Sequence, residues 1–226
     1  QIVSSERLRL ILNSNDYQIT FNNNFILYLI GIFYNFFIPG GFGGDAYKFY
    51  LMKKNYEWDF KKLFKLLVFD RLIGLGALVC ILFFMTQNFI LDLNLIYTII
   101  SLLLTLLLGY YIVKYLFNNQ HTYFKSLGIS FINQFLQFLT IFFVILSLGI
   151  ENNFIEIIIV FICSSILSVF SIGGIGIREY IFLISASFIN VSPELSASVG
   201  LLFTFSASFS TLPGLFYLLS KPNFLK

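Results

Sequence analysis

Charged residues are scarce in this sequence: they make up 11% of the 226 residues, whereas hydrophobic residues make up 58%. Soluble domains average about 25% charged and about 45–50% apolar residues. The mean hydropathy of +0.87 departs from that of a soluble protein in the same direction. The shortage of charge excludes an ordinary soluble domain and predicts a protein that faces lipid.

The residues that usually carry catalysis or metal binding are also scarce. The single histidine, His121, lies in a polar stretch, which argues against a histidine-based metal site or triad. Cys80 and Cys163 lie within apolar runs without metal-ligand spacing and are interpreted as buried thiols. The glycine-rich turns lack the Gly-Lys-Ser/Thr of a nucleotide loop and follow apolar helices rather than strands. The sequence therefore predicts no catalytic residue, no metal, no cofactor and no nucleic-acid partner.

Long apolar runs dominate what is present. A bilayer core of about 30 Å needs about 20 apolar residues in a helix. Four runs meet this length and predict membrane spans at about 66–85, 95–117, 127–149 and 195–219, the last interrupted by Pro213-Gly214. Two shorter runs, 25–38 and 154–172, end in glycine clusters, and a short apolar piece at 180–189 follows the second.

The basic residues predict the orientation of these spans. Lys48, Lys53, Lys54, Lys61, Lys62 and Lys65 crowd one connection. The connections near Asp92, Glu151 and Glu194 contain no Lys or Arg. Because cytoplasmic loops carry the excess of Lys and Arg, we expect a multi-pass protein of the cell membrane whose Lys-rich 47–65 loop and C-terminus are cytoplasmic.

The same orientation constrains the two broken segments. The segment 25–55 has to begin and end in the cytoplasm, and the segment 154–190 has to begin and end outside. Each is then a re-entrant hairpin that turns at its glycines, and the two enter from opposite faces. The alternative makes 154–172 a full span, with 180–194 returning as a second, short span.

The two glycine breaks share a pattern. Gly40–Asp45 and Gly173–Arg178 both read Gly-Gly-x-Gly-x-charged, and a tyrosine follows two residues later. Together with their opposite orientation, this predicts an inverted repeat. The predicted fold is an all-α polytopic membrane protein, an inverted-repeat helical bundle forming a single transmembrane domain over 1–226. The repeat requires two spans before the first hairpin, so N-terminal spans are expected to be missing, with Arg7–Leu12 the cytoplasmic tail of the second.

Ionisable residues near the breaks are the candidates for a binding site. Such residues cost about 2.5–3.5 kcal/mol each at the centre of a membrane helix, so they indicate function by default. The glycines leave backbone N–H groups free to bind an anion such as a lipid phosphate. The candidate lipid-binding residues are Asn35, Pro39, Gly40, Gly41, Gly43, Gly44, Asp45, Lys48, Asp70, Arg71, Gly173, Gly174, Gly176, Arg178 and Glu179.

Each candidate also has a structural interpretation. Arg71 lies about one helical turn from the lysines and could snorkel to the interface. Arg178 could form an ion pair with Asp70 or Asp45. For Gln134 and Gln137, in the 127–149 span, hydrogen bonds to a neighbouring helix are preferred over lining a polar path.

At these residues the sequence resembles the flippase-like membrane family that includes the transmembrane region of lysylphosphatidylglycerol synthases. The resemblance rests on four motifs and extends from about residue 7 to the end. The motifs are Asn35-Phe-Phe-Ile-Pro39-Gly-Gly-Phe-Gly-Gly44-Asp45, Asp70-Arg71-Leu-Ile-Gly74, Gly173-Gly-Ile-Gly176-Ile-Arg178-Glu179, and Leu212-Pro213-Gly214 with Tyr217. Against the family pattern, we expect N-terminal spans and a soluble aminoacyl-transferase domain to be missing from this sequence.

The resemblance implies movement of a polar-headed lipid, with an anionic or polyprenyl-phosphate headgroup, between leaflets. A lipid-modifying or glycosyl transferase is an expected partner. Two alternatives remain open: a membrane-embedded transferase acting on a lipid-linked sugar or amino acid, and a non-transporting membrane subunit of a lipid-modifying synthase. The sequence favours transport over catalysis, because it contains no paired-carboxylate or histidine motif.

Overall fold

The computed structural model describes residues 1–37, 43–56, 58–91, 94–168 and 175–219. Within these ranges it contains helices and no strand, which confirms the all-α class. In chain order they are α1 (Ile2–Asn13), α2 (Phe21–Phe37), α3 (Gly43–Tyr56), α4 (Phe60–Met85), the π-helical turn η1 (Thr86–Ile90), α5 (Leu95–Phe117), α6 (Gln120–Ser147), α7 (Phe154–Leu167), α8 (Ile177–Ile184), α9 (Ala186–Ile189), α10 (Pro193–Phe209) and α11 (Leu212–Leu219).

The four predicted spans correspond to helical segments that are long and apolar enough to cross a membrane. These segments are Phe60–Phe89, Leu95–Phe117, Gln120–Ser147 and Pro193–Leu219. Their length and composition make the chain a multi-helix membrane protein.

The Lys-rich 47–65 segment is not a loop, contrary to the prediction. Its first half lies in α3, and α4 begins at Phe60, so Lys61 and Lys62 lie in the first turn of α4. The Asp59 carboxylate accepts a hydrogen bond from the Lys62 backbone N–H at 2.8 Å and caps the helix there. Lysine also has a good helix propensity, so the cluster extends the helices rather than interrupting them.

The break in the last span lies just before the predicted Pro213-Gly214. Helix α10 ends at Phe209 and α11 begins at Leu212, so Pro213 is in the first turn of α11, where its missing N–H breaks no helical hydrogen bond. Gly214 is buried against the backbone of Leu29 in α2, with no room for a Cβ. The break therefore lets α11 pack closely on α2.

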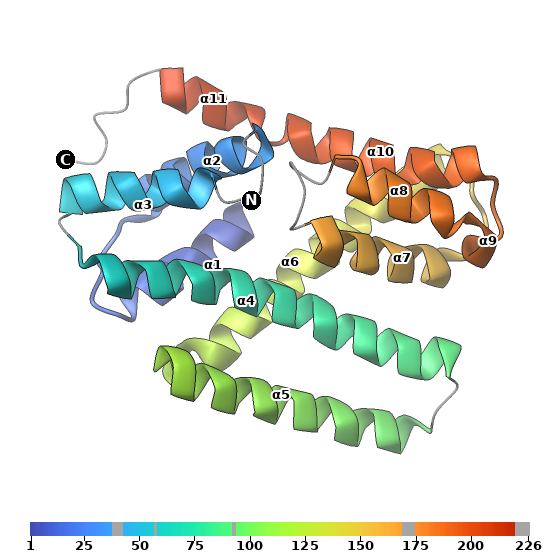
Figure 1. Cartoon of the computed structure of the whole chain (residues 1–226), viewed down its shortest axis with the longest axis horizontal. Helices are drawn as coiled ribbons and strands as arrows, with labels where there is room; N and C mark the ends of the chain where they lie inside the picture. Colours follow the sequence, from blue (N-terminus) through green and yellow to red (C-terminus); the bar gives the residue numbers. More distant parts are fainter. Residues whose placement is uncertain (38–42, 57, 92–93, 169–174, 220–226) are drawn as a thin grey trace.

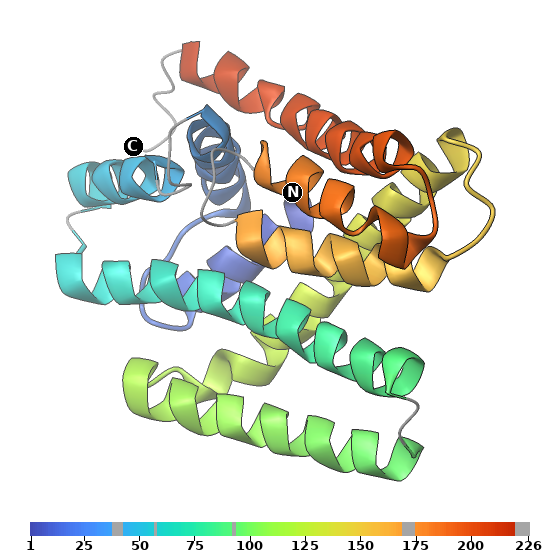
Figure 2. The ribbon, with the colours of Figure 1, turned by 45° about the vertical axis from the view of Figure 1, so that its right-hand side comes forward.

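Each predicted hairpin corresponds to two short helices packed side by side, α2 with α3 and α7 with α8. The ends of α2 and α7 and the starts of α3 and α8 point toward the middle of the molecule, and the other ends of the two pairs lie at opposite ends of it (Figures 1 and 2). Helix α7 has 14 residues, about 21 Å at 1.5 Å per residue, which is shorter than the bilayer core. The re-entrant course and the inverted repeat stay predictions.

Residues Arg7–Leu12, expected to be the cytoplasmic tail of a preceding span, lie in α1, a helix packed among others; their cytoplasmic placement stays a prediction. Helix α1 packs against α2, α4 and α6. Leu8, Ile11 and Leu12 share one face at helical spacing and are fully buried. This apolar face holds α1 in the interior, where its polar side chains meet those of α4 and α6.

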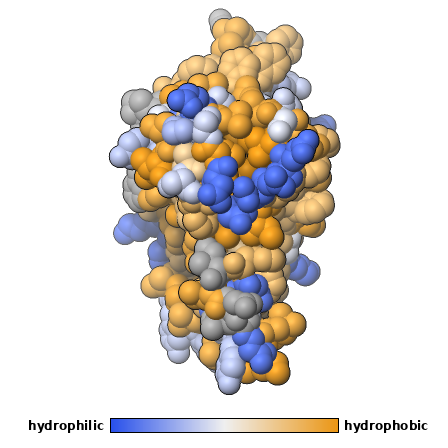
Figure 3. Space-filling model, turned by 90° about the vertical axis from the view of Figure 1, so that its right-hand side faces the viewer, coloured by the Kyte–Doolittle hydropathy of each residue, from blue (hydrophilic) through white to orange (hydrophobic). Residues whose placement is uncertain are grey.

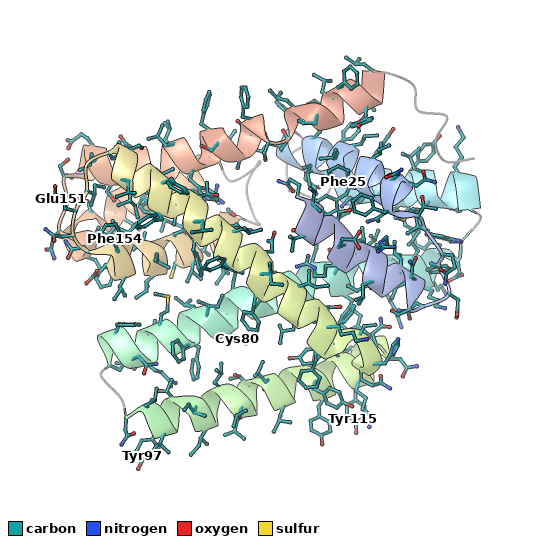
Figure 4. The ribbon with its side chains drawn as sticks, turned by 180° about the vertical axis from the view of Figure 1, so that it is seen from behind. Phe25, Cys80, Tyr97, Tyr115, Glu151 and Phe154 are labelled. Carbon is teal, nitrogen blue, oxygen red and sulfur yellow. The ribbon has the colours of Figure 1, made fainter. Side chains whose placement is uncertain are left out.

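Charge is sorted between the two ends of the molecule. The end of α3 and the start of α4, which carry most of the lysines, lie on the left in Figure 1. Figure 3 looks at the opposite end and shows hydrophilic patches among hydrophobic surface. Figure 4 places Glu151 and Tyr97 at this second end and Tyr115 at the lysine-bearing one. The connections rich in lysine and those without basic residues therefore lie at opposite ends of the long axis.

Candidate functional site

A cavity of about 570 Å³ lies between α1, α2, α4, α6, α7, α8 and α10. Three arginines line it, each from a different helix: Arg7 from α1, Arg71 from α4 and Arg178 from α8. The prediction named Arg71 and Arg178, and the structure brings both to this one cavity. Arg7 was missed.

Arg7 is the most firmly held of the three. Its Nε donates to Asp70 Oδ1 at 2.7 Å and its Nη2 to Asp70 Oδ2 at 3.1 Å, while Nη1 donates to the Ser130 hydroxyl at 2.9 Å. A two-point guanidinium–carboxylate pair is among the stronger polar contacts in proteins. Gly74 lies one turn after Asp70, and a Cβ there would come within 2.9 Å of Arg7 Nη1. Asp70 thus binds Arg7, and Gly74 leaves room for its guanidinium. The bonds of Arg7 to Asp70 and Ser130 join α1, α4 and α6.

Arg71 belongs to a second cluster of charges. Its Nε donates to the carboxylate of Asp45 at the start of α3. Lys48 reaches the same carboxylate at 3.4 Å and lies 4.3 Å from the centre of the Tyr28 ring. Lys48 is 4% exposed, so the cluster is largely shielded. Because Arg71 binds inside the molecule and lines the cavity, the structure favours a role there over snorkelling.

Arg178 lacks a carboxylate partner among the residues that the structure describes. Its Nη1 donates to the Thr204 hydroxyl at 3.1 Å, and its Nη2 lies 3.5 Å from the Ser168 hydroxyl. The guanidinium carbon lies 4.8 Å from the centre of the Phe203 ring, at cation–π distance. The side chain is 7% exposed, yet its Nε has no hydrogen-bond partner within the described ranges.

The alternative interpretation of Arg178, an ion pair with Asp70 or Asp45, is therefore wrong. The physical reason is that both carboxylates are already occupied, Asp70 by Arg7 and Asp45 by Arg71 and Lys48. Buried charges are normally paired or hydrogen-bonded. Arg178 is thus the cavity's only arginine without a carboxylate, within the ranges that the structure describes.

Glu179, next in the chain, does not pair with Arg178. Its Oε2 accepts a hydrogen bond from the Gly176 N–H at 2.6 Å and caps the start of α8. Gly176 has a φ of +83°, a conformation that favours glycine. Gly176 and Glu179 therefore fix the start of α8, and with it the position of Arg178.

The candidate residues around the first glycine break also position a charged side chain. The Gly44 N–H donates to Asn35 Oδ1 at 2.8 Å, which joins α2 to the start of α3. Gly44 also lies against the backbone of Gly31 in α2. Asn35, Gly43 and Gly44 therefore position Asp45 and do not line the cavity. Pro39, Gly40, Gly41, Gly173 and Gly174 lie outside the described residues.

Neutral polar side chains form much of the remaining cavity wall. Asn133, Gln134, Gln137, Thr140, Ser165 and Ser206 are among them. Gln134 is 3% exposed, and its Oε1, like the Ser165 hydroxyl, has no hydrogen-bond partner within the described ranges. The preference for helix-to-helix hydrogen bonds at Gln134 and Gln137 is therefore wrong, because both face the cavity between the helices.

Local sequence does contain a signal for Arg7. Arg9 has a carboxylate one turn away and pairs with Glu6 at 2.7 Å. Arg7 has no acidic residue three or four positions away, and it shares its helix with the buried Leu8 and Ile11. A basic residue among buried apolar neighbours with no local partner requires a distant one.

Comparison with known proteins yields one family. The chain matches the lysylphosphatidylglycerol synthase transmembrane region over residues 1–127 and 112–214. No curated protein and no solved structure matches it.

Proposed function

Because the chain belongs to the family of the lysylphosphatidylglycerol synthase transmembrane region, we propose that it is a lipid translocase. It binds the polar headgroup of a lipid in its central cavity and moves that lipid between the leaflets of the cell membrane. The observation that carries the proposal is the meeting of Arg7, Arg71 and Arg178 in one polar cavity among membrane-length helices.

The proposed placement in the membrane follows the sorting of charge. The lysine-bearing end, with the end of α3 and the start of α4, faces the cytoplasm, and the last span ends there too. The α2–α3 and α7–α8 pairs then enter from opposite faces as re-entrant hairpins related by an inverted repeat. Ligand sites of inverted-repeat transporters lie near the midplane, where broken helices meet, and the cavity lies beside the starts of α3 and α8.

Within this arrangement Arg71 and Arg178 bind the lipid phosphate, and the acyl chains stay in the surrounding lipid. Asp45 holds Arg71 and also pairs with Lys48, and the Arg7–Asp70 pair fixes α1 against α4 and α6. A gradient or the downhill flow of lipid supplies the energy. A lipid-modifying or glycosyl transferase is the proposed partner that supplies or consumes the lipid.

Transport is favoured over catalysis by the state of the carboxylates. Asp70 and Asp45 are occupied by basic side chains, and Glu179 by the Gly176 N–H. Among the described residues that line the cavity there is no carboxylate. None of the three acids named for the transferase alternative is thus placed as a general base toward a ligand in the cavity.

Loss of Arg178 is expected to stop lipid movement. The full-length protein in phosphatidylcholine vesicles is assayed for movement of a labelled phosphatidylglycerol between leaflets. Arg178→Ala and Arg71→Ala are expected to slow it about tenfold to a hundredfold, because a hydrogen bond to a charged group contributes about 1.5–3 kcal/mol. The control is Arg9→Ala, which removes an arginine paired with Glu6 outside the cavity. Unchanged movement in folded Arg178→Ala contradicts the proposal.

A further inference from the structure

We infer that the cavity selects a lipid whose phosphate carries an uncharged, hydroxyl-bearing headgroup, and that it disfavours an aminoacylated headgroup such as a lysyl ester. The inference rests on the proposed function and names its substrate class. The inferred substrate of this chain thus differs from lysylphosphatidylglycerol, the lipid after which the family is named. Three features carry the inference: the charge of the cavity, an unpartnered donor and the neutral polar groups of the cavity wall.

The charge around the cavity is positive in excess. Arg7 and Asp70 neutralise each other, whereas Asp45 is shared by Arg71 and Lys48, and Arg178 has no carboxylate in the described part of the chain. A ligand that enters therefore meets cationic groups whose charge is not fully balanced. This attracts an anion and repels an ammonium group.

Arg178 supplies the directional part of the site. It is 93% buried, since its exposed fraction is 7%, and its Nη1 and Nη2 already have hydroxyl partners. The Nε donor has none in the described ranges. Buried donors are nearly always satisfied in native proteins, so an unsatisfied one points to a ligand. A phosphate oxygen is the acceptor best matched to a guanidinium, because charge-assisted bonds are the strongest of this kind.

The neutral part of the cavity wall matches hydroxyl groups rather than an ammonium group. Gln134 Oε1, on α6, and the Ser165 hydroxyl, on α7, are buried without partners in the described ranges, and Asn133 and Gln137 of α6 also line the cavity. Amides and hydroxyls both donate and accept, as do the hydroxyls of glycerol or a sugar. A lysyl ammonium only donates, and buried charges require an opposite charge. No carboxylate among the described lining residues can provide it.

Two lipids share this chemistry: phosphatidylglycerol and a sugar linked by phosphate to a polyprenol. The experiment compares three reporters in vesicles of phosphatidylcholine that contain the purified full chain: phosphatidylglycerol, a hexosyl polyprenyl phosphate and lysylphosphatidylglycerol. Either of the first two is expected to cross at least tenfold faster than the lysyl lipid, and the faster one identifies the source. Equal or faster movement of the lysyl lipid overturns the selectivity while the proposed function stands. Movement of none of the three overturns both.

A carboxylate placed in the neutral wall is expected to change the selectivity. Gln134→Glu keeps the shape of the side chain and adds a negative charge, so the rate for lysylphosphatidylglycerol relative to phosphatidylglycerol is expected to rise at least tenfold. Gln18→Glu makes the same chemical change at an exposed position between α1 and α2 and is expected to leave the ratio unchanged. Gel filtration checks that both variants are folded. An unchanged ratio in folded Gln134→Glu contradicts the assignment of this wall to the headgroup.

Discussion

Replacing Asp70 with alanine is expected to lower the free energy of unfolding by about 3–5 kcal/mol, the usual effect of removing one partner of a buried ion pair. Asp70 accepts from two nitrogens of Arg7, and the two side chains are 11% and 8% exposed. The substitution leaves the Arg7 guanidinium buried with only the Ser130 hydroxyl as a partner. Titration of the purified protein in detergent with a denaturing surfactant measures the change.

The matched control is Asp16→Asn, because Asp16 has a φ of +69° and asparagine tolerates this left-handed conformation whereas alanine does not. Asp16 also pairs with a basic residue, Lys62, but at 3.9 Å and with 98% of its side chain exposed. Exposed pairs contribute about 0–1 kcal/mol, so this variant is expected to unfold nearly as the parent does. The double variant Arg7→Met/Asp70→Leu removes both charges and is expected to recover much of the stability, because an apolar pair leaves no unpaired charge. Equal stability of Asp70→Ala and Asp16→Asn would sink this assignment.

This pair also shows what the sequence could predict and what it could not. A charge inside an apolar run or beside a glycine break can be identified from the local sequence, which is how Asp70, Arg71 and Arg178 were named. The partner of each charge cannot, because Arg7 and Asp70 are 63 positions apart and meet only through the packing of α1 against α4. Once Arg7 takes Asp70, the remaining charges are redistributed, and Arg178 is left with hydroxyls.

The spans and the site differ in the same way. Each span depends on about 20 consecutive residues and on one physical quantity, the cost of transfer into lipid, so all four were predicted, with ends at most seven residues from those of the helical segments. The start of α4 was missed by six residues because a local cap at Asp59 extends the helix. The direction of Gln134 depends on how α6 lies between α1, α4 and α10, a property of the assembled bundle.

Gly44→Ala is expected to destabilise the chain by about 1–3 kcal/mol or more, the range for overpacking. A Cβ at position 44 would overlap the backbone carbonyl of Gly31 and press on Asn35, so α2 and α3 have to separate. Separation weakens the Gly44–Asn35 hydrogen bond and moves Asp45, which holds Arg71. Lipid movement is therefore expected to fall together with stability, although no cavity residue has been changed.

Gly76→Ala, in α4, is the matched control. Apart from its chain neighbours and the backbone of its own helix, a Cβ at that position has no atom within 4 Å, and alanine favours a helix over glycine by about 1 kcal/mol. This variant is expected to be as stable as the parent or slightly more so, which gives the two substitutions effects of opposite sign. Surfactant-induced unfolding and the vesicle assay measure both variants side by side. The same loss of stability in both would contradict the assignment. It would show that the close approach of Gly44 to Gly31 does not hold α3 in place, and that Arg71 is not positioned in this way through Asp45.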